Sequence, residues 1–291
     1  MYSIREMVIE GHTIVAHSFN SAKNSIPAVL LHGDSTSLNV WTLAPPKIIQ
    51  ERFRWHALSL PGHYPARFPE GFRKQDLTAH LIVRILSEAI RRLEPDQKVI
   101  LIGHSTGGFI ALNLAAYSPD IVHCVISISG FAQGKCSGLY GALQWLARHG
   151  KTAEKIAKID YKILSSSRIM FRAGLSVYVS DRRKLYSFPG LNDIIDLVYP
   201  DTKNLDLNAM MYYLDQLPGF DIEGQLPNIA VPTLVMAGKK DPVVPPYQSR
   251  IIAEKVPHCE LVLLDGSGHL PMAERPIQYN QAITDWLQKV I

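Results

Sequence analysis

Short apolar stretches alternate with longer amphipathic stretches along most of the chain. Eight of the short apolar stretches have the length and the β-branched content of strands. We expect strands near residues 4–9, 12–17, 28–32, 54–60, 98–102, 122–128, 232–237 and 260–265. The first two meet at Glu10-Gly11 and predict an antiparallel hairpin at a sheet edge, whereas the later ones are continuously apolar, as in strands covered on both faces. The pattern therefore predicts a mostly parallel sheet of the α/β class.

Between Phe131 and about Pro227 the strand rhythm stops and the pattern becomes helical. We expect an insertion of helices there, after the sixth strand. Its large apolar side chains are Leu139, Tyr140, Leu143, Trp145, Leu146, Ile169, Met170, Phe171, Met210, Met211, Tyr212, Tyr213 and Leu214. Most of them should pack inside the insertion. A small unit cannot bury them all, so some should line a mainly apolar pocket.

One predicted helix of this insertion has two chemically different faces. They are a lysine face, with Lys151, Lys155, Lys158 and Lys162, and an isoleucine face, with Ile156, Ile159 and Ile163. The simpler interpretation is a solvated lysine face opposite a packed isoleucine face. The alternative is a surface helix that contacts an anionic membrane or an acidic carrier, such as the phosphopantetheine arm of an acyl carrier protein.

Composition limits the class of protein. The 291 residues are 47% hydrophobic, enough for one large core with a modest insertion, and they contain no repeat or low-complexity linker. The net charge of +4 is mild, and no basic patch interleaved with aromatic residues indicates nucleic-acid binding. We expect no secretory leader and no transmembrane segment, hence a cytoplasmic protein. Its three cysteines, Cys124, Cys136 and Cys259, lack metal-ligand spacing and should be free thiols.

The candidate chemistry begins at Lys98–Gly108, where an apolar run leads directly into G-H-S-T-G with Ser105 at its centre. This pattern is typical of a nucleophile elbow, a sharp turn from a strand into a helix. Gly103 and Gly107 are needed where a Cβ would clash, and Ser105 is held in a strained, exposed position. The turn also places the backbone N–H of Thr106 at a helix N-terminus, where it can stabilise a developing oxyanion.

A serine hydroxyl needs a base to attack a carbonyl, and the base needs an acid to orient it. His269 follows an apolar strand in the loop of L-L-D-G-S-G-H-L-P, at the strand end where open α/β sheets place their sites. Asp241 follows another strand in M-A-G-K-K-D-P. The order Ser105, Asp241, His269, each at the exit of a strand, predicts a catalytic triad.

These motifs together resemble the α/β-hydrolase fold superfamily, in the type that carries an inserted cap. The matching segments are A-V-L-L-H-G-D-S at 28–35, S-L-P-G-H at 59–63, the elbow at 103–107, G-K-K-D-P-V-V-P at 238–245 and G-H-L-P-M-A-E-R-P at 268–276. The resemblance implies a mostly parallel eight-stranded sheet flanked by helices, with a helical cap inserted after the sixth strand. It implies a core of residues 1–130 and 228–291 and a cap of residues 131–227.

In that superfamily, the loop after the third strand supplies a second oxyanion donor. This role carries over to the backbone N–H of Asp34, with its neighbour Ser35 as the alternative, and His32 would brace the loop. Asp34 departs from the pattern, because a carboxylate beside an oxyanion hole opposes negative charge unless it points away or pairs with a cation. A second departure is S-L-P-G-H-Y-P-A-R at 59–67, where Ser59 and Tyr64 replace the usual acid and glycine. We interpret that segment as a surface loop near the pocket mouth.

The resemblance and the residues together predict a serine hydrolase that cleaves a carboxylic ester with an apolar, medium-sized group through an acyl-enzyme. The partner is then a small apolar ester. A thioesterase or a C–C bond hydrolase is the alternative on the same scaffold, because one triad serves all these reactions. A ligand-binding homologue without turnover is a third possibility. No metal or cofactor is expected, since G-H-S-T-G-G has neither dinucleotide-loop spacing nor a phosphate-loop lysine.

Overall fold

The computed structural model describes residues 2–21 and 25–291. Eight strands form one sheet: β1 Tyr2–Ile9, β2 His12–Phe19, β3 Ala28–Leu31, β4 Trp55–Leu58, β5 Val99–His104, β6 Val122–Ile128, β7 Thr233–Gly238 and β8 Cys259–Leu264. Their spatial order is β1-β2-β4-β3-β5-β6-β7-β8. The β1-β2 and β2-β4 pairs are antiparallel, and all other pairs are parallel. All eight predicted strands, and the edge hairpin, are confirmed.

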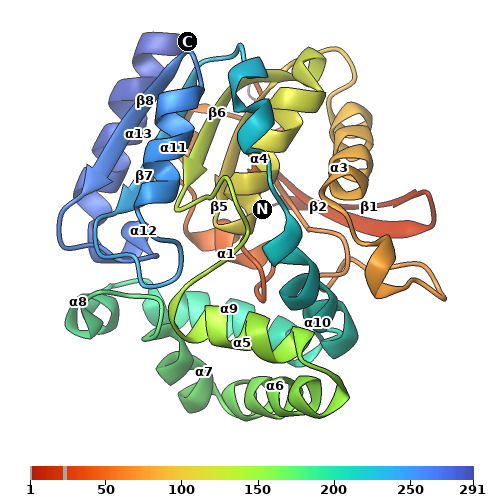
Figure 1. Cartoon of the computed structure of the whole chain (residues 1–291). Helices are drawn as coiled ribbons and strands as arrows, with labels where there is room; N and C mark the ends of the chain where they lie inside the picture. The colour runs from red at the N-terminus through yellow and green to blue at the C-terminus, as the bar shows by residue number, and fades with distance from the viewer. Residues whose placement is uncertain (1, 22–24) are drawn as a thin grey trace.

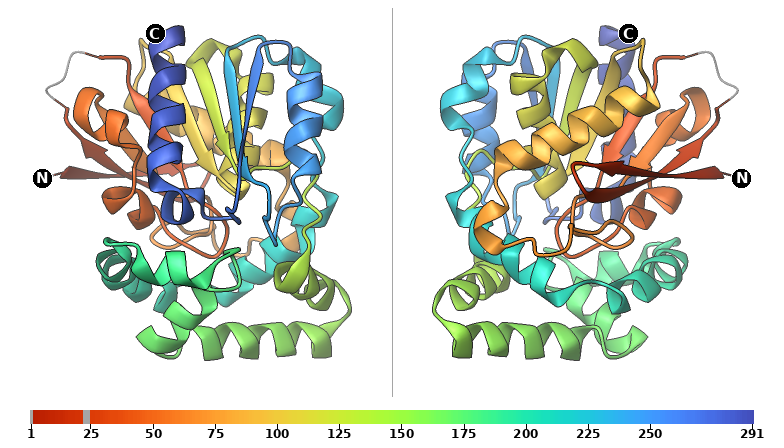
Figure 2. Two further views of the ribbon diagram at one scale, coloured as in Figure 1. Left: turned by 90° about the vertical axis from the view of Figure 1, so that its left-hand side faces the viewer. Right: turned by 90° about the vertical axis from the view of Figure 1, so that its right-hand side faces the viewer.

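Helices cover both faces of this sheet and one of its ends (Figures 1 and 2). Those that pack beside the sheet or near its ends are α1 Asn39–Leu43, α2 Lys47–Arg52, α3 Ala79–Leu93, α4 Thr106–Tyr117, α11 Tyr247–Lys255, α12 Pro271–Glu274 and α13 Pro276–Val290. Four short 3₁₀ helices are η1 Lys74–Asp76, η2 Pro119–Ile121, η3 Leu217–Gly219 and η4 Glu223–Asn228.

Alternate residues of the central strands face two separate apolar cores. Leu101 of β5 packs in the core that contains α3 and α4, whereas Ile100 and Ile102 pack in the core that contains α1, α2 and α13. A strand buried on both faces must be apolar at every position, and all five residues from Val99 to Gly103 are buried. The continuous apolar runs of the sequence are thereby explained.

Six further helices stand between β6 and β7 in the chain: α5 Gly138–Arg148, α6 Lys151–Leu164, α7 Arg168–Leu175, α8 Arg182–Ser187, α9 Leu191–Lys203 and α10 Leu207–Gln216. We call them the helical layer. They lie together beyond one end of the sheet, at the bottom of Figures 1 and 2. The predicted change to a helical pattern after the sixth strand is confirmed. Of the thirteen large apolar side chains named for the insertion, Leu139, Trp145, Ile169 and Met170 are exposed and the other nine are buried or partly buried, in line with the expectation that most pack inside.

The prediction of a packed isoleucine face on α6 is wrong. Ile156, Ile159 and Ile163 are 51%, 57% and 54% exposed. Lys151, Lys155 and Lys162 are exposed as well, so the lysines and isoleucines lie on neighbouring parts of one outward surface. The mistake has a physical cause: periodicity shows which residues share a helix face, but not which face meets the rest of the protein.

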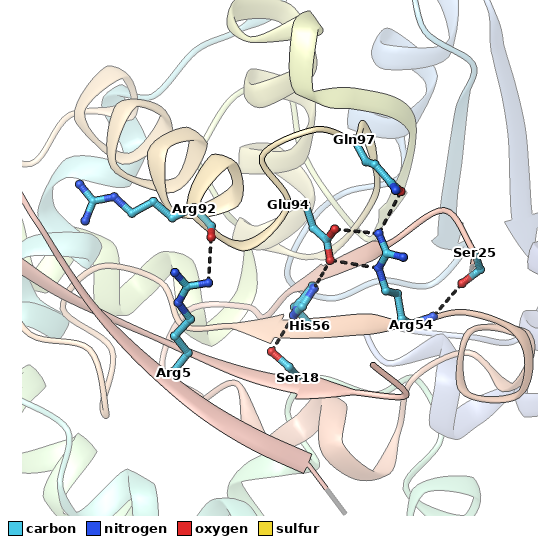
Figure 3. A network of polar contacts seen from close by, with 8 residues as sticks. All are labelled: Arg5, Ser18, Ser25, Arg54, His56, Arg92, Glu94 and Gln97. Atoms are coloured by element: carbon cyan, nitrogen blue, oxygen red, sulfur yellow. Dashed lines mark hydrogen bonds and ion pairs between the residues drawn. The ribbon is translucent and has the colours of Figure 1, made fainter. Parts of the chain in front are cut away.

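A polar network ties the sheet edge to the end of α3, far from the helical layer (Figure 3). The Glu94 carboxylate accepts two hydrogen bonds from the Arg54 guanidinium, at 3.1 and 2.8 Å, and pairs with His56 Nε2 at 2.9 Å. His56 Nδ1 lies 2.8 Å from Ser18 Oγ on β2. A carboxylate with this many partners is well compensated for its partial burial, so we interpret the network as structural.

Candidate active site

Ser105 connects β5 to α4 in a strained conformation, with φ 55° and ψ −119°. A Cβ on Gly103 would lie 2.1 Å from the Gly107 carbonyl oxygen, and one on Gly107 would lie 2.3 Å from the Leu31 carbonyl oxygen. Neither position can therefore hold a side chain. The predicted strand-to-helix turn, and the need for glycine at both positions, are confirmed. Strain of this kind persists only where the surroundings enforce it.

His269 and Asp241 come together from two loops. His269 follows β8 and Asp241 follows β7, and His269 Nδ1 lies 2.7 Å from Asp241 Oδ2. Their side chains are only 2% and 0% exposed. The other carboxylate oxygen, Asp241 Oδ1, accepts the backbone N–H groups of Val243 and Val244 at 2.8 and 2.9 Å. Asp241 is thus held by the backbone on one side and orients the imidazole on the other.

Backbone contacts fix His269 further. Its N–H donates to the Tyr178 carbonyl oxygen at 2.8 Å, and its own carbonyl oxygen accepts from His104 Nε2 at 2.8 Å. Burial, together with the neighbouring His269, lowers the pKa of His104 to about 3, so His104 stays neutral and donates from Nε2. His104 stands next to Ser105 in the elbow motif, but its sequence position alone predicted no role for it.

Glu274 ties the His269 loop to the helical layer. Its carboxylate accepts the Gly268 N–H at 2.6 Å and the backbone N–H groups of Ser180 and Asp181 at 2.9 and 3.1 Å. Glu274 is 3% exposed. A buried carboxylate with several backbone donors is a rigid connector. It belonged to the G-H-L-P-M-A-E-R-P match, but the sequence analysis gave it no function.

A cavity of about 230 Å³ lies between the sheet and the helical layer. Ser105 and His269 line it on the sheet side, together with Gly33, Asp34 and Ser35. Most of its other walls are apolar, with lining residues from α5 to α10 that include Leu139, Leu143, Phe171, Leu175, Leu191 and Leu214. The expectation that some apolar residues of the insertion line a pocket is confirmed.

The loop after β3 lies beside Ser105. His32 is fully buried; its Nδ1 donates to the Gly33 carbonyl oxygen at 2.7 Å, and its Nε2 accepts the Leu60 N–H at 3.1 Å. Burial lowers the pKa of His32 well below its usual value, so the ring is neutral. His63 Nε2 donates to Asp34 Oδ1 at 2.8 Å, so it has no lone pair to accept the Ser35 N–H, which lies 3.3 Å away. The backbone N–H groups of Asp34 and Ser35 both stay candidates for the second oxyanion donor.

The Asp34 carboxylate is buried and fully engaged. It accepts hydrogen bonds from the Tyr140 hydroxyl and from Ser35 Oγ, and it pairs with His63 Nε2 at 2.8 Å. These partners offset the charge that raised doubt about Asp34 in the sequence. The prediction that residues 59–67 form a surface loop is wrong, because Ser59 through His63 are buried and His63 reaches Asp34.

Replacing Tyr140 with phenylalanine is expected to lower the free energy of unfolding by about 1.5–3 kcal/mol, since a buried carboxylate loses one donor. Thermal unfolding measures the effect. Tyr117→Phe is the control, because Tyr117 is 49% exposed and its hydroxyl has no such partner among the described residues. Equal melting temperatures for the two variants would contradict the role given to the Tyr140 hydroxyl.

The cysteines stand apart from the cavity chemistry. Cys124, Cys136 and Cys259 are free, and burial raises the pKa of each to about 12, so none is a ready nucleophile. In residues 2–21 and 25–291 no three His, Cys, Asp or Glu side chains gather as a metal-ligand set. Every helix in those same residues is too short or too polar to span a bilayer.

A mostly parallel eight-stranded sheet, with a strained serine between the fifth strand and its helix, defines an α/β-hydrolase-fold enzyme. The chain belongs to the Alpha/beta hydrolase family, whose model matches residues 28–282. It is 25% identical over 235 residues to the putative carbamate hydrolase RutD of Stutzerimonas stutzeri, covering 77% of this chain and 76% of that protein. It is also 25% identical over 281 residues to the human monoacylglycerol lipase ABHD6, covering 94% and 79% of the two chains.

Solved structures share the fold. The enol-lactonase from Burkholderia xenovorans LB400 superposes with a TM-score of 0.76 over 98% of this chain and 100% of that chain, at 19% sequence identity. An esterase from Exiguobacterium antarcticum superposes with a TM-score of 0.76, covering 99% and 100% of the two chains, at 17% identity. At these identities the likeness concerns the architecture alone.

Proposed function

We propose that the protein is a serine hydrolase that cleaves a carboxylic ester with an apolar, medium-sized group. Ser105 is the nucleophile, His269 the general base and Asp241 the residue that orients it. The proposal rests chiefly on one observation: the buried His269–Asp241 hydrogen bond of 2.7 Å meets the strained Ser105 at a single, mainly apolar cavity. Relatives that are named a lipase and a carbamate hydrolase are consistent with this chemistry.

In the proposed mechanism, Asp241 accepts a hydrogen bond from the Nδ1–H of His269, which keeps that proton on Nδ1 and leaves Nε2 free to take the Ser105 proton. The serine oxygen attacks the ester carbonyl, and the backbone N–H groups of Asp34 and Thr106 stabilise the oxyanion. Protonated His269 then gives its proton to the departing alcohol. Water, activated by the same imidazole, releases the acid and restores the serine.

We also propose that the helical layer is a cap that selects substrates, with boundaries near residues 131 and 227. What supports this is its contribution of walls to the cavity over Ser105. Apolar walls on the cap favour apolar acyl or alcohol groups over highly polar ones.

Initial rates on a p-nitrophenyl ester series of increasing acyl length test the function. We expect the highest kcat/KM at medium length, because the cavity is lined mainly by apolar side chains and has a limited volume of about 230 Å³. A fluorophosphonate should label wild-type protein at Ser105. Absence of both turnover and labelling would contradict the proposal and favour a ligand-binding role, whereas labelling without ester turnover would point to thioester or C–C bond substrates.

A further inference from the structure

Helix α6 is oriented against its own amphipathic pattern. Its three isoleucines face outward and are more than half exposed. A neighbouring face, with Ala157, Asp160, Tyr161 and Leu164, lines the cavity over Ser105, and Asp160 lies at its border with the isoleucines, four residues after Ile156. These four residues have the i, i+3, i+4, i+7 spacing of one helical face. A helix that exposes isoleucine and turns a carboxylate toward an apolar cavity violates the usual burial rule, and such violations concentrate at functional sites.

Two polar groups on this inward face have no partner. In the described part of the chain, Asp160 Oδ2 and the Tyr161 hydroxyl are buried and form no hydrogen bond. Leaving a buried polar group unpaired is costly, and more so for a carboxylate. The Asp34 carboxylate differs, since Tyr140, Ser35 and His63 satisfy it. On the helical-layer side of the cavity, the unmet hydrogen-bonding capacity among the described residues therefore lies at Asp160 and Tyr161, while Trp41 Nε1 is a further unpaired donor from α1.

The charge of the cavity limits what can satisfy these groups. Among the described residues, its lining contains the carboxylates of Asp34 and Asp160 but no lysine or arginine. Burial, together with the negative charge of Asp34, raises the pKa of Tyr161, so its hydroxyl stays protonated and can donate. This inward face of α6 offers one acceptor, Asp160 Oδ2, and one donor, the Tyr161 O–H.

We propose that Asp160 and Tyr161 form a polar subsite that binds a hydroxyl group of the substrate at the helical-layer wall of the cavity. The hydroxyl donates to Asp160 Oδ2 and accepts from the Tyr161 O–H, so both unpaired groups are satisfied together. An ammonium has only donors and leaves the Tyr161 proton without an acceptor. A carboxylate is repelled by Asp34 and Asp160. This inference rests on the proposed ester hydrolysis and specifies its substrate as an apolar ester with a hydroxyl group.

Two matched ester pairs test the subsite, because the hydroxyl can belong to either half of the substrate. Heptyl butyrate is compared with 6-hydroxyhexyl butyrate, and butyl heptanoate with butyl 6-hydroxyhexanoate, so that a methyl replaces the hydroxyl in each pair. We expect wild-type kcat/KM to favour the hydroxyl ester by about 10- to 100-fold in at least one pair, as for a hydrogen bond to a charged group. The 6-aminohexyl and carboxylate-ended analogues should not share this advantage.

The variants are Asp160→Leu, which is close in shape, and Tyr161→Phe. Asp160→Leu should erase the preference and improve turnover of the methyl-ended ester, while Tyr161→Phe should reduce the preference. Asp193→Leu is the control, because Asp193 is an exposed aspartate of the same helical layer. The melting temperature gives a readout that needs no turnover: removing the buried, unpaired Asp160 Oδ2 should raise it in Asp160→Leu, whereas Asp193→Leu should not raise it.

The rate measurements distinguish a failure of the proposed hydroxyl subsite from a failure of the proposed esterase function. Turnover of the methyl-ended esters with no hydroxyl preference in either pair would overturn the subsite and leave the esterase standing. A preference that persists in Asp160→Leu, or one shown for the ammonium ester instead, would also overturn it. If no ester is cleaved, the esterase proposal fails. The melting temperature still tests the subsite in that case: a value for Asp160→Leu below that of the wild type would show that Asp160 has a structural partner, which would overturn the subsite.

Discussion

Replacing Ser105 with alanine is expected to abolish ester hydrolysis, with kcat reduced by about 10³- to 10⁶-fold, as for other triad serines. The loss follows from chemistry, since no acyl-enzyme can form without the hydroxyl. Alanine should fit the turn, because it adds no atom beyond the Cβ that Ser105 already has. His269→Ala should be comparably severe, as the serine then has no base. Initial rates at saturating ester, with the melting temperature measured alongside, check both variants.

Ser129→Ala is the matched control for the serine. Ser129 follows β6, is buried, and has a positive φ of 48°, close to the 55° of Ser105. Its hydroxyl does not line the cavity. Near wild-type turnover in this variant would show that removing a hydroxyl from a strained, buried serine is harmless away from the site. Residual activity above about a thousandth of wild type in Ser105→Ala or His269→Ala would contradict the assigned roles.

The strands of the sheet could be predicted because each one is specified by residues that are adjacent in the sequence. Each central strand is an apolar run, and the turn residues that follow carry their own signals, such as glycine at 103 and 107. Topology then brings the ends of parallel strands to one edge. For this reason the positions of Ser105, Asp241 and His269 at the ends of β5, β7 and β8 were predictable without any contact information.

The surroundings of the site could not be predicted in the same way. Asp34 meets His63 across 29 residues and Tyr140 across 106 residues, and no local pattern encodes such pairs. The buried loop at Ser59–His63 looked like a surface loop because its sequence is rich in turn formers. The orientation of α6 was likewise undetermined, because its two faces could be recognised but their environment could not. Tertiary packing decides these features.

The two sides of the cavity differ in how far their polar groups are paired within the protein. On the sheet side, buried hydrogen bonds from backbone groups hold Asp241, His269 and Glu274. On the α6 side, Asp160 Oδ2 and the Tyr161 hydroxyl have no hydrogen-bond partner among the described residues. A preorganised side suits the reacting atoms, whose geometry must be maintained. An unsatisfied side suits recognition, because a substrate can supply the missing hydrogen bonds.

Replacing Asp241 with asparagine is expected to reduce kcat by about 10⁴-fold while the fold and KM change little, as for the corresponding change in other triads. The backbone N–H groups of Val243 and Val244 both donate to Asp241 Oδ1, so the amide oxygen must take that position. The amide NH₂ then faces His269 Nδ1 and donates to it. Nδ1 can no longer carry a proton, which moves to Nε2, and Nε2 then cannot accept the serine proton.

The matched control is Asp265→Asn, which makes the same chemical change at a side chain that is 83% exposed and pairs with Lys239. It should leave kcat within about twofold, since exposed ion pairs contribute little. Retention of more than about a tenth of wild-type kcat in Asp241→Asn would mean that the tautomer of His269 is not set by Asp241. Because the two backbone donors dictate how the amide must sit, this substitution tests the orientation of the base separately from the presence of the nucleophile.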